Sequence, residues 1–240
     1  LTRLNYNLKS DEWNFERGVL ENQLSEKDHS STYQAFASWK YRMTEDLTMI
    51  SGLHYIQFAL NKNYSVEPRL ALKWQLDDRQ SFNAGVGLHS KLEPVSTYLA
   101  KRYDDNGGYT QPNKDLELTK AAHFILGYDR KLGENTHVKI ETYYQHLYDV
   151  PVESGPTSFS LLNESEGYTT RSLVNEGLGK NYGVEITVER YLHKGLYYMG
   201  TLSLFRSLYT PLDGIERKSA FDNNYVANLI GGKELNVGAP

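Results

Sequence analysis

The stretch of sequence that decides the fold is residues 65–76, which read SVEPRLALKWQL. Apolar side chains stand at the even positions from Val66 to Leu76, and mostly polar or small ones stand at the odd positions. Successive side chains of a strand point to opposite faces of a sheet, so this period of two predicts a strand with one apolar and one polar face. The stretch exceeds the usual globular strand of about 5–6 residues and reaches the roughly 9–11 residues that cross a bilayer.

The same alternation recurs along the chain. It is clearest in residues 82–88, 137–145 and 181–189. No stretch of comparable length follows the helical period of 3.6, and no run of about 18 apolar residues is present to form a transmembrane helix. We predict about eleven strands, over residues 1–8, 13–20, 32–43, 47–60, 65–76, 80–92, 116–130, 136–149, 181–192, 196–209 and 221–233.

The connections between these predicted strands alternate in length. The tight, polar ones are Lys9–Glu12, Thr44–Asp46, Asp77–Arg79, Lys131–Asn135 and His193–Gly195. The longer ones are 21–31, 93–115, 150–180 and 210–220, and only 61–64 breaks the order by being short. In an up-and-down sheet every second connection lies at the same end, so the alternation predicts one end with turns and one with long loops. Outer-membrane β-barrels have this asymmetry, with short periplasmic turns and longer external loops.

Composition agrees with a barrel wall that has thin apolar coverage. The chain has 240 residues, no cysteine, 19 tyrosines and a net charge of −4. Its mean hydropathy is −0.60, low for a protein that buries one large core. The missing cysteines exclude disulfides, thiolate metal sites and thiol nucleophiles, and the slightly acidic charge gives no indication of a nucleic-acid partner.

Several tyrosines fall close to the predicted strand ends: Tyr41, Tyr64, Tyr128, Tyr148, Tyr191 and Tyr209. Aromatic rings favour the headgroup level of a bilayer because part of the ring is apolar and part can form hydrogen bonds. Tyrosine also favours strands in general. The placement therefore fits an aromatic girdle without requiring one.

Three segments resemble barrel strands of TonB-dependent outer-membrane receptors. They are residues 66–74 (VEPRLALKW), residues 177–185 (GLGKNYGVE) and residues 223–229 (NNYVANL), and the tract 47–98 around the first is also similar. The resemblance runs from about Ala35 to the end of the chain. It implies an all-β, antiparallel, up-and-down transmembrane barrel in the outer membrane of a Gram-negative bacterium, whose full barrel has 22 strands and a plugged lumen.

The resemblance also implies a function and partners. Such receptors import large nutrients, such as iron chelates, cobalamin or oligosaccharides, with energy from the inner membrane. We therefore expect the chain to contact outer-membrane lipid, an unknown nutrient ligand and, through a plug domain, the inner-membrane TonB complex. Eleven strands are half of 22, so we expect residues 1–240 to be part of one barrel domain, with the plug and the C-terminal strands outside the chain.

The sequence offers no catalytic, cofactor or metal site. The seven histidines lack an HExxH-like spacing, no GxSxG elbow is present, and Gly85-Val86-Gly87 lies inside a predicted strand rather than before a helix. We therefore expect a protein that is not an enzyme and uses no cofactor. The charged residues of the polar strand faces are instead candidates to face the lumen: Glu67, Arg69, Lys73, Lys139, Glu141, Glu185 and Glu189.

Two other architectures remain open at this level. A soluble β-sandwich that binds a ligand or carbohydrate would also alternate apolar and polar residues, with its tyrosines stacking on sugars. A small complete barrel is a further possibility, although such barrels usually have an even number of strands. A sandwich would place two packed sheets around a dry centre, and that difference can be seen in the structure.

Overall fold

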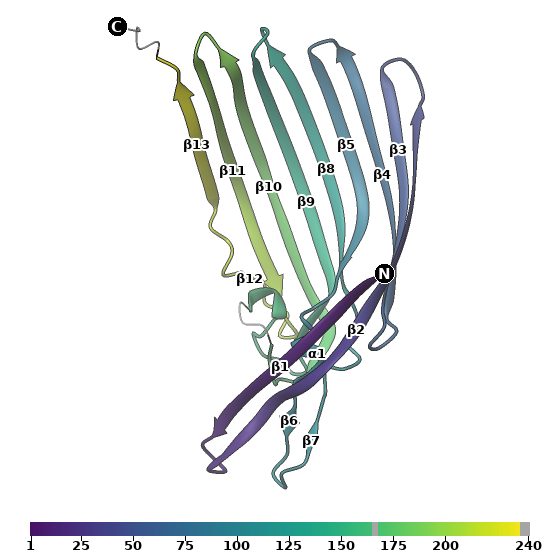
Figure 1. The fold of residues 1–240 in the computed structure, drawn as a ribbon, viewed down its shortest axis with the longest axis vertical. Coiled ribbons are helices and arrows are strands. Elements are labelled where there is room, and N and C mark those ends of the chain that lie inside the picture. Colours follow the sequence, from purple (N-terminus) through teal and green to yellow (C-terminus); the bar gives the residue numbers. More distant parts are fainter. Residues whose placement is uncertain (165–167, 236–240) are drawn as a thin grey trace, which may run out of the picture.

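A computed structural model of the protein describes residues 1–164 and 168–235. Its main feature is one antiparallel sheet of eleven strands, which confirms the predicted class and number (Figure 1). The nine long strands that follow each other across the sheet are β1 (Thr2–Asn14), β2 (Val19–Arg42), β3 (Leu47–Phe58), β4 (Tyr64–Asp77), β5 (Gln80–Lys91), β8 (Thr119–Leu132), β9 (Thr136–Glu153), β10 (Leu173–His193) and β11 (Leu196–Thr210).

The sheet is open, and two strands pair with the outer edge of its last long strand, β11. The short strand β12 (Arg217–Lys218) and β13 (Tyr225–Lys233) both pair with β11, while β1 forms the opposite edge. The remaining elements are a two-stranded sheet, β6 (Arg102–Tyr103) with β7 (Tyr109–Thr110), and the short helices α1 (Val95–Leu99) and η1 (Leu161–Asn163). Within the described residues no helix has the length and apolar character needed to cross a membrane.

The two ends of the sheet differ as the sequence predicts. The turns 43–46, 78–79, 133–135 and 194–195 all lie at one end, which we call the turn end (Figure 1). The connections 59–63, 92–118, 154–172 and 211–224 lie at the other, the loop end. Each of the seven long strands β3, β4, β5, β8, β9, β10 and β11 has at least 12 residues, so each is long enough to cross a bilayer.

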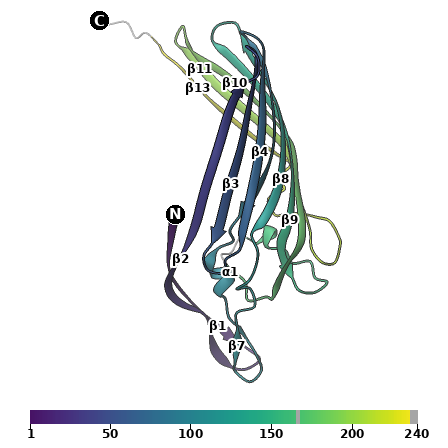
Figure 2. The same ribbon diagram turned by 90° about the vertical axis from the view of Figure 1, so that its right-hand side faces the viewer.

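The predicted turn Lys9–Glu12, strand 13–20 and loop 21–31 are wrong. Residues 15–18, inside the predicted strand, form the turn between β1 and β2. The chain stays extended through 9–12 and 21–31, because β1 and β2 form one long hairpin that pairs from Thr2–Thr32 to Asn14–Val19, with a register shift at Ser10/Asp11. Apart from Leu24, residues 21–31 are all polar, so no period of two is visible. Backbone pairing does not need an apolar face where the hairpin extends beyond the main sheet (Figures 1 and 2).

The predicted loop 150–180 is also too long. Its first residues continue β9 and residues 173–180 begin β10, so that the connection is 154–172. The pairing of β9 and β10 shifts register on both sides of Gly177. A Cβ at Gly177 would lie 2.3 Å from Val152 Cγ1 and 2.9 Å from Val150 O. Irregular pairing and glycines at close approaches explain why this part of the strand lacks the alternating pattern.

This close approach leads to a prediction about Gly177. We expect Gly177→Ala to destabilise the loop end by about 1–3 kcal/mol, because the added methyl group overpacks a site whose neighbours Val150 and Val152 are fully buried. The matched control is Gly155→Ala, since a Cβ there meets nothing within 4 Å. Thermal unfolding of the receptor that contains this chain measures both. Equal midpoints for the two variants would contradict the prediction.

The largest cluster of buried apolar side chains lies at the loop end rather than between layers. It joins the β1–β2 hairpin, the end of β3, loop 92–118 and the start of β10 through Leu24, Phe58, Tyr98, Leu99, Ala100, Leu116 and Leu173, and Phe159 and Tyr168 of the connection 154–172 pack against it. Leu4, Tyr6 and Leu8 of β1 pack against it. Along most of the sheet, large apolar side chains stay exposed on one face. Within the described residues no second large sheet covers that face, so a sandwich with a dry centre is not what this chain forms.

Candidate functional site

Cross-strand register divides the sheet into two faces. The odd positions of β4, β5, β8, β9 and β10 share one face, which we call the polar face, and the even positions share the apolar face. In β2 and β3 the parity is reversed, because His54 lies opposite Glu67 and Phe36 lies opposite His54. One row on the polar face runs Lys73–Asn83–Gly127–Glu141–Glu185 across five strands. All seven charged residues singled out from the sequence lie on the polar face: Glu67, Arg69, Lys73, Lys139, Glu141, Glu185 and Glu189.

Glu67 is the most enclosed of these residues, with 2% of its surface exposed. Its Oε2 lies 2.7 Å from Arg69 Nη2 and 3.0 Å from His54 Nδ1. Its Oε1 accepts hydrogen bonds from the backbone N–H and the hydroxyl of Ser90, at 3.0 and 2.5 Å. A buried carboxylate needs partners of this kind to offset the loss of its hydration. The group therefore joins β3, β4 and β5 on the polar face.

A second cluster lies nearer the turn end. Lys139 and Glu141 form an ion pair of 2.6 Å, and Glu141 faces Glu185 directly across the β9–β10 pair. Glu141 and Glu185 line a hollow of about 470 Å³, together with Tyr143, Gln145 and Asn181. Like charges placed opposite each other in a sheet repel, so this hollow favours a cationic or hydrogen-bond-donating partner.

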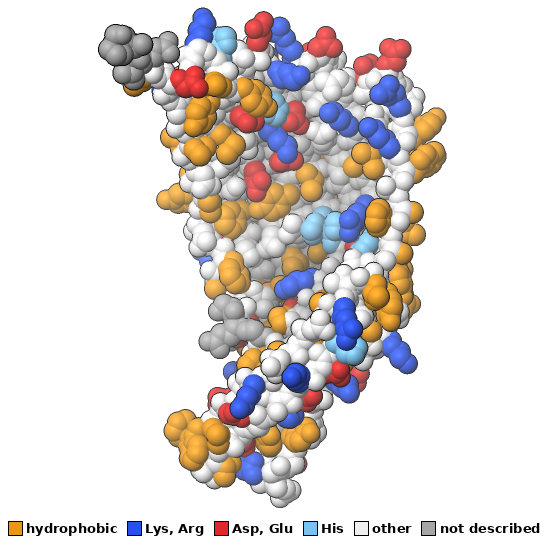
Figure 3. Space-filling model, in the orientation of Figure 1, with side chains coloured by type: hydrophobic (Ala, Val, Ile, Leu, Met, Phe, Trp, Pro, Cys, Tyr) orange, Lys and Arg blue, Asp and Glu red, His pale blue; other side chains and the backbone are white. Residues whose placement is uncertain are grey.

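Other polar pairs on this face were not predicted from the sequence. Asp129 accepts a hydrogen bond from Asn83 Nδ2 at 2.7 Å, and its other oxygen lies 3.1 Å from His137 Nε2. The rings of His89 and His123 lie 4.3 Å apart, on neighbouring strands. Alternation alone places these residues on the polar face, but register is needed to pair them. Figure 3 shows histidines at mid-height of a hollowed face, with acidic and basic side chains toward the turn end.

The polar face also has an apolar area at mid-height. Phe36, Ile50 and Ile125 are 82%, 44% and 42% exposed. They line a hollow of about 470 Å³ that Arg69 and the ring pair His89–His123 also border. Exposed apolar groups on an otherwise polar surface indicate a contact area. Among the described residues, no group of three or more His, Cys, Asp or Glu side chains is arranged to hold a metal ion.

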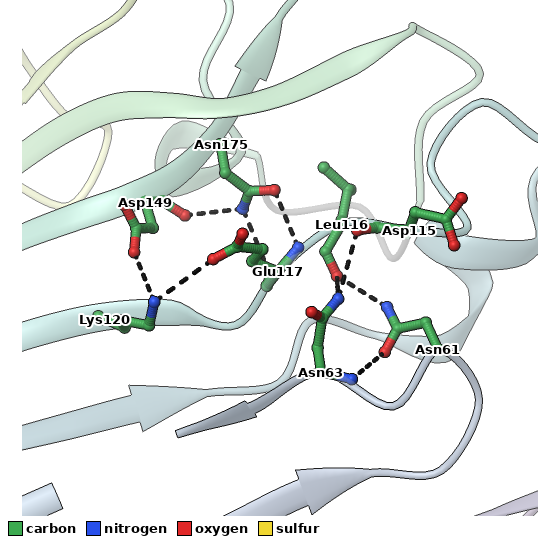
Figure 4. Close-up of polar contacts among 8 residues, drawn as sticks. All are labelled: Asn61, Asn63, Asp115, Leu116, Glu117, Lys120, Asp149 and Asn175. Atoms are coloured by element: carbon green, nitrogen blue, oxygen red, sulfur yellow. Dashed lines mark hydrogen bonds and ion pairs between the residues drawn. The ribbon is translucent and has the colours of Figure 1, made fainter. Parts of the chain in front are cut away.

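The long loop 92–118 is held in place by asparagine side chains (Figure 4). Asn61 and Asn63 donate to the carbonyl oxygen of Leu116 at 2.8 and 3.0 Å. Asn175 at the start of β10 accepts a hydrogen bond from the Glu117 N–H and donates to the Asp149 carbonyl. These bonds satisfy backbone groups that strand pairing does not reach. The loop is therefore an ordered part of the loop end.

Two ionisable groups in the connections at the loop end have shifted pKa values. Tyr98 is fully buried in the cluster at the loop end, and burial raises the pKa of its phenol well above the ordinary value. In loop 211–224, the hydrogen bond from Arg217 to Asp213, 2.7 Å long, lowers the pKa of that carboxyl. Asp213 is ionised at neutral pH in any case, and the lowered pKa lets the carboxylate keep its Arg217 partner to more acidic pH.

The apolar face has aromatic rings toward both ends. At the turn end, Trp74, Phe82 and Tyr128 form a row, with ring centroids 6.5 and 4.9 Å apart. At the loop end, the rings of Tyr55 and Tyr64 lie 6.0 Å apart. Tyr64 and Trp74 lie on the same strand, ten residues apart, which is about 33 Å along the strand and roughly 25 Å in height at the usual barrel tilt.

The predicted girdle tyrosines are only partly at such positions. Tyr41 and Tyr64 are about half exposed on the apolar face near strand ends, as a girdle residue would be. Tyr191 is also about half exposed, but it is an odd position of β10 and so falls on the polar face. Tyr209 is buried, with 6% of its surface exposed, so a girdle role for this residue is wrong. It lies at the loop end of β11, where β12 pairs with it directly at Arg217.

Several solved structures have a similar fold at low sequence identity. The siderophore receptor PirA from Acinetobacter baumannii matches with a TM-score of 0.65 and 14% identity, over 87% of this chain and 32% of that one. The ferric-catecholate import receptor Fiu from E. coli K12 matches with a TM-score of 0.62 and 10% identity, over 90% of this chain and 33% of that one. The FrpB iron transporter (F3-3 variant) from Neisseria meningitidis matches with a TM-score of 0.57 and 17% identity, over 84% of this chain and 30% of that one.

The chain thus spans about a third of the length of these structures. A search of curated protein sequences finds no match. The family model for the TonB-dependent receptor-like β-barrel matches residues 2–237, nearly the whole chain. Its members are receptors and transporters rather than enzymes. The chain therefore belongs to the TonB-dependent receptor β-barrel family, and it is an outer-membrane receptor segment of a Gram-negative bacterium.

Proposed function

We propose that this chain forms part of the wall of a receptor that imports a large nutrient across the outer membrane with energy from the TonB complex. The observation that supports this most directly is the difference between the two faces. One face is apolar with aromatic rings toward both ends, and the other holds hydrogen-bonded charges such as Glu67, Asp129 and Glu141. A barrel wall between lipid and a wet or plugged lumen needs both.

In this proposal the polar face lines the lumen, and the seven charged residues named above face it. Residues 1–240 belong to one barrel domain, which strands outside the chain complete. The apolar area around Phe36, Ile50 and Ile125 supports contact with a plug domain, because a plug would cover surface that is otherwise exposed on this face. The plug would link the receptor to the inner-membrane TonB complex.

The loop end is the proposed site of nutrient capture. Loop 92–118 and the described residues Phe159 and Tyr168 of the connection 154–172 pack with the β1–β2 hairpin around a common cluster and present an ordered surface. An ordered surface loses little conformational entropy when a ligand binds. Among the nutrients implied by the family, we favour an iron chelate, since the similar solved structures include an iron transporter and siderophore receptors.

Uptake by whole cells tests this proposal. Cells that carry the full receptor gene, grown under iron limitation, are expected to accumulate a radiolabelled ferric chelate that cells lacking the gene do not. Removing TonB is expected to abolish that difference, because the inner membrane supplies the energy. Labelled cobalamin and an oligosaccharide serve as parallel substrates. Receptor-dependent uptake of one of them alone would reject iron, and uptake that persists without TonB would reject the mechanism.

A further inference from the structure

A groove on the apolar face is lined by residues from five strands, β3, β4, β5, β8 and β9, and has a volume of about 520 Å³. Its walls are large apolar side chains, including Leu72, Trp74, Phe82 and Leu126. Its floor is formed where side chains are small, at Ala84 in β5 and Thr142 in β9. Both lie in one cross-strand row with Leu72 and Leu126. The groove therefore exists because two small residues interrupt a row of large ones.

The side chains above the groove change in a fixed order toward the turn end. Along β8, Leu126, Tyr128 and Arg130 follow each other on the apolar face, about 7 Å apart. Leu126 lines the groove, Tyr128 belongs to the aromatic row, and Arg130 is exposed beyond it. The Tyr128 hydroxyl donates to Gln80 Oε1 at 2.6 Å, which holds the ring at this level. Apolar, aromatic and cationic groups thus succeed one another with height.

The guanidinium N–H groups of Arg130 are available to a ligand. The described residues include no hydrogen-bond or ion-pair partner for its side chain. The carboxylate of Asp77 interacts electrostatically with Arg130 but forms no hydrogen bond with it, since it already accepts hydrogen bonds from the Arg79 N–H and from Gln80 Nε2. A second cation, Arg190 of β10, lies on the same face at the turn end and has a buried Nε without a hydrogen-bond partner.

We propose that this groove binds one glycerophospholipid of the inner leaflet, with an acyl chain against Ala84 and the phosphate at Arg130. The short turns of such barrels face the periplasm, so the turn end lies in the phospholipid leaflet. The order of side chains matches the order of groups in the lipid, from hydrocarbon through the interface to the phosphate. Guanidinium groups form strong charge-assisted hydrogen bonds with phosphate oxygens. The inference goes beyond nutrient uptake and uses only family membership and the two faces.

Native mass spectrometry of the full detergent-purified receptor with dioleoylphosphatidylglycerol tests the inference. Wild type is expected to retain one molecule that Ala84→Leu loses, because the larger side chain fills the floor of the groove. The matched control is Ala122→Leu, the same change on the same face of β8 but outside the groove. Arg130→Gln is expected to weaken retention about tenfold. Heat-modifiable gel migration checks that every variant is folded.

Two further ligands distinguish the contribution of the acyl chains from that of the phosphate, and a lipid of the inner leaflet from one of the outer leaflet. Dioleoylglycerol, which lacks a phosphate, is expected to bind weakly and equally to wild type and to Arg130→Gln. Equal retention by wild type and Ala84→Leu would overturn the site, and equal retention by wild type and Arg130→Gln would overturn the phosphate contact. Lipid A that displaces the phospholipid at equal concentration would overturn the assignment to the inner leaflet. None of these readouts depends on transport, so failure here leaves the uptake experiment unaffected.

Discussion

Replacing Phe124 by arginine is expected to cost the receptor about 2–4 kcal/mol of folding free energy in a bilayer. The same change at Ile125 is expected to cost about 1 kcal/mol or less, because the hollow beside Ile125 leaves the long side chain room to reach lumen water even where a plug lies against this face. The two residues are neighbours on β8, and they are 50% and 42% exposed in this chain, so burial by the described residues does not separate them. They differ in the face on which they lie. An arginine at Phe124 would face hydrocarbon near mid-height, where its charge cannot be hydrated.

Folding of both variants of the full receptor into phospholipid vesicles, followed by denaturant titration, measures this difference. The fraction assembled in outer membranes gives a second readout, from heat-modifiable gel migration. Equal costs at the two positions would mean that both faces meet a similar environment. A larger cost at Ile125 would place lipid on the polar face and reverse the proposed orientation of the wall. Either result would reject the lumen assignment of Glu67, Glu141 and their neighbours.

Replacing Asn113 by alanine is expected to release the loop end. Asn113 is fully buried, its Nδ2 donates to the Arg171 carbonyl at 2.9 Å, and its Oδ1 accepts from the Leu173 N–H at 2.9 Å. Alanine would leave the Leu173 N–H without a partner in a buried place and the Arg171 carbonyl without one in a partly buried place, at about 1–3 kcal/mol each. Loop 92–118 would then lose one of its attachments to the start of β10, and we expect a local cost of about 2–5 kcal/mol.

Limited trypsin digestion of the folded receptor measures this cost, because cleavage within loop 92–118 requires local opening. Each 1.4 kcal/mol corresponds to about a tenfold change in the open population, so Asn113→Ala is expected to be cut at least about tenfold faster. The matched control is Asn61→Ala. Asn61 also donates to two backbone carbonyls of this loop, but it is only half buried, so water can replace it. Equal cleavage rates for Asn113→Ala and Asn61→Ala would contradict the prediction.

Much of the site follows from local sequence because the period of two is a local property of a strand. Residues 65–76 alone place Glu67, Arg69 and Lys73 on one face and Leu70, Leu72 and Trp74 on the other, and the structure agrees. The pairing of Glu67 with His54 and Ser90 could not be predicted in this way. It depends on which residues lie opposite each other across β3, β4 and β5, and no local pattern specifies register.

The sequence by itself determined the all-β class, the long amphipathic strands and the difference between the turn end and the loop end. These features depend on alternation and turn residues, which act over a few positions. Only the tertiary structure decided that residues 21–31 continue a strand, that 173–180 belong to β10, and that the long loops form an ordered cluster with the β1–β2 hairpin. The physical reason is that backbone pairing and contacts between distant segments stabilise these parts, although their own side chains show no periodic pattern.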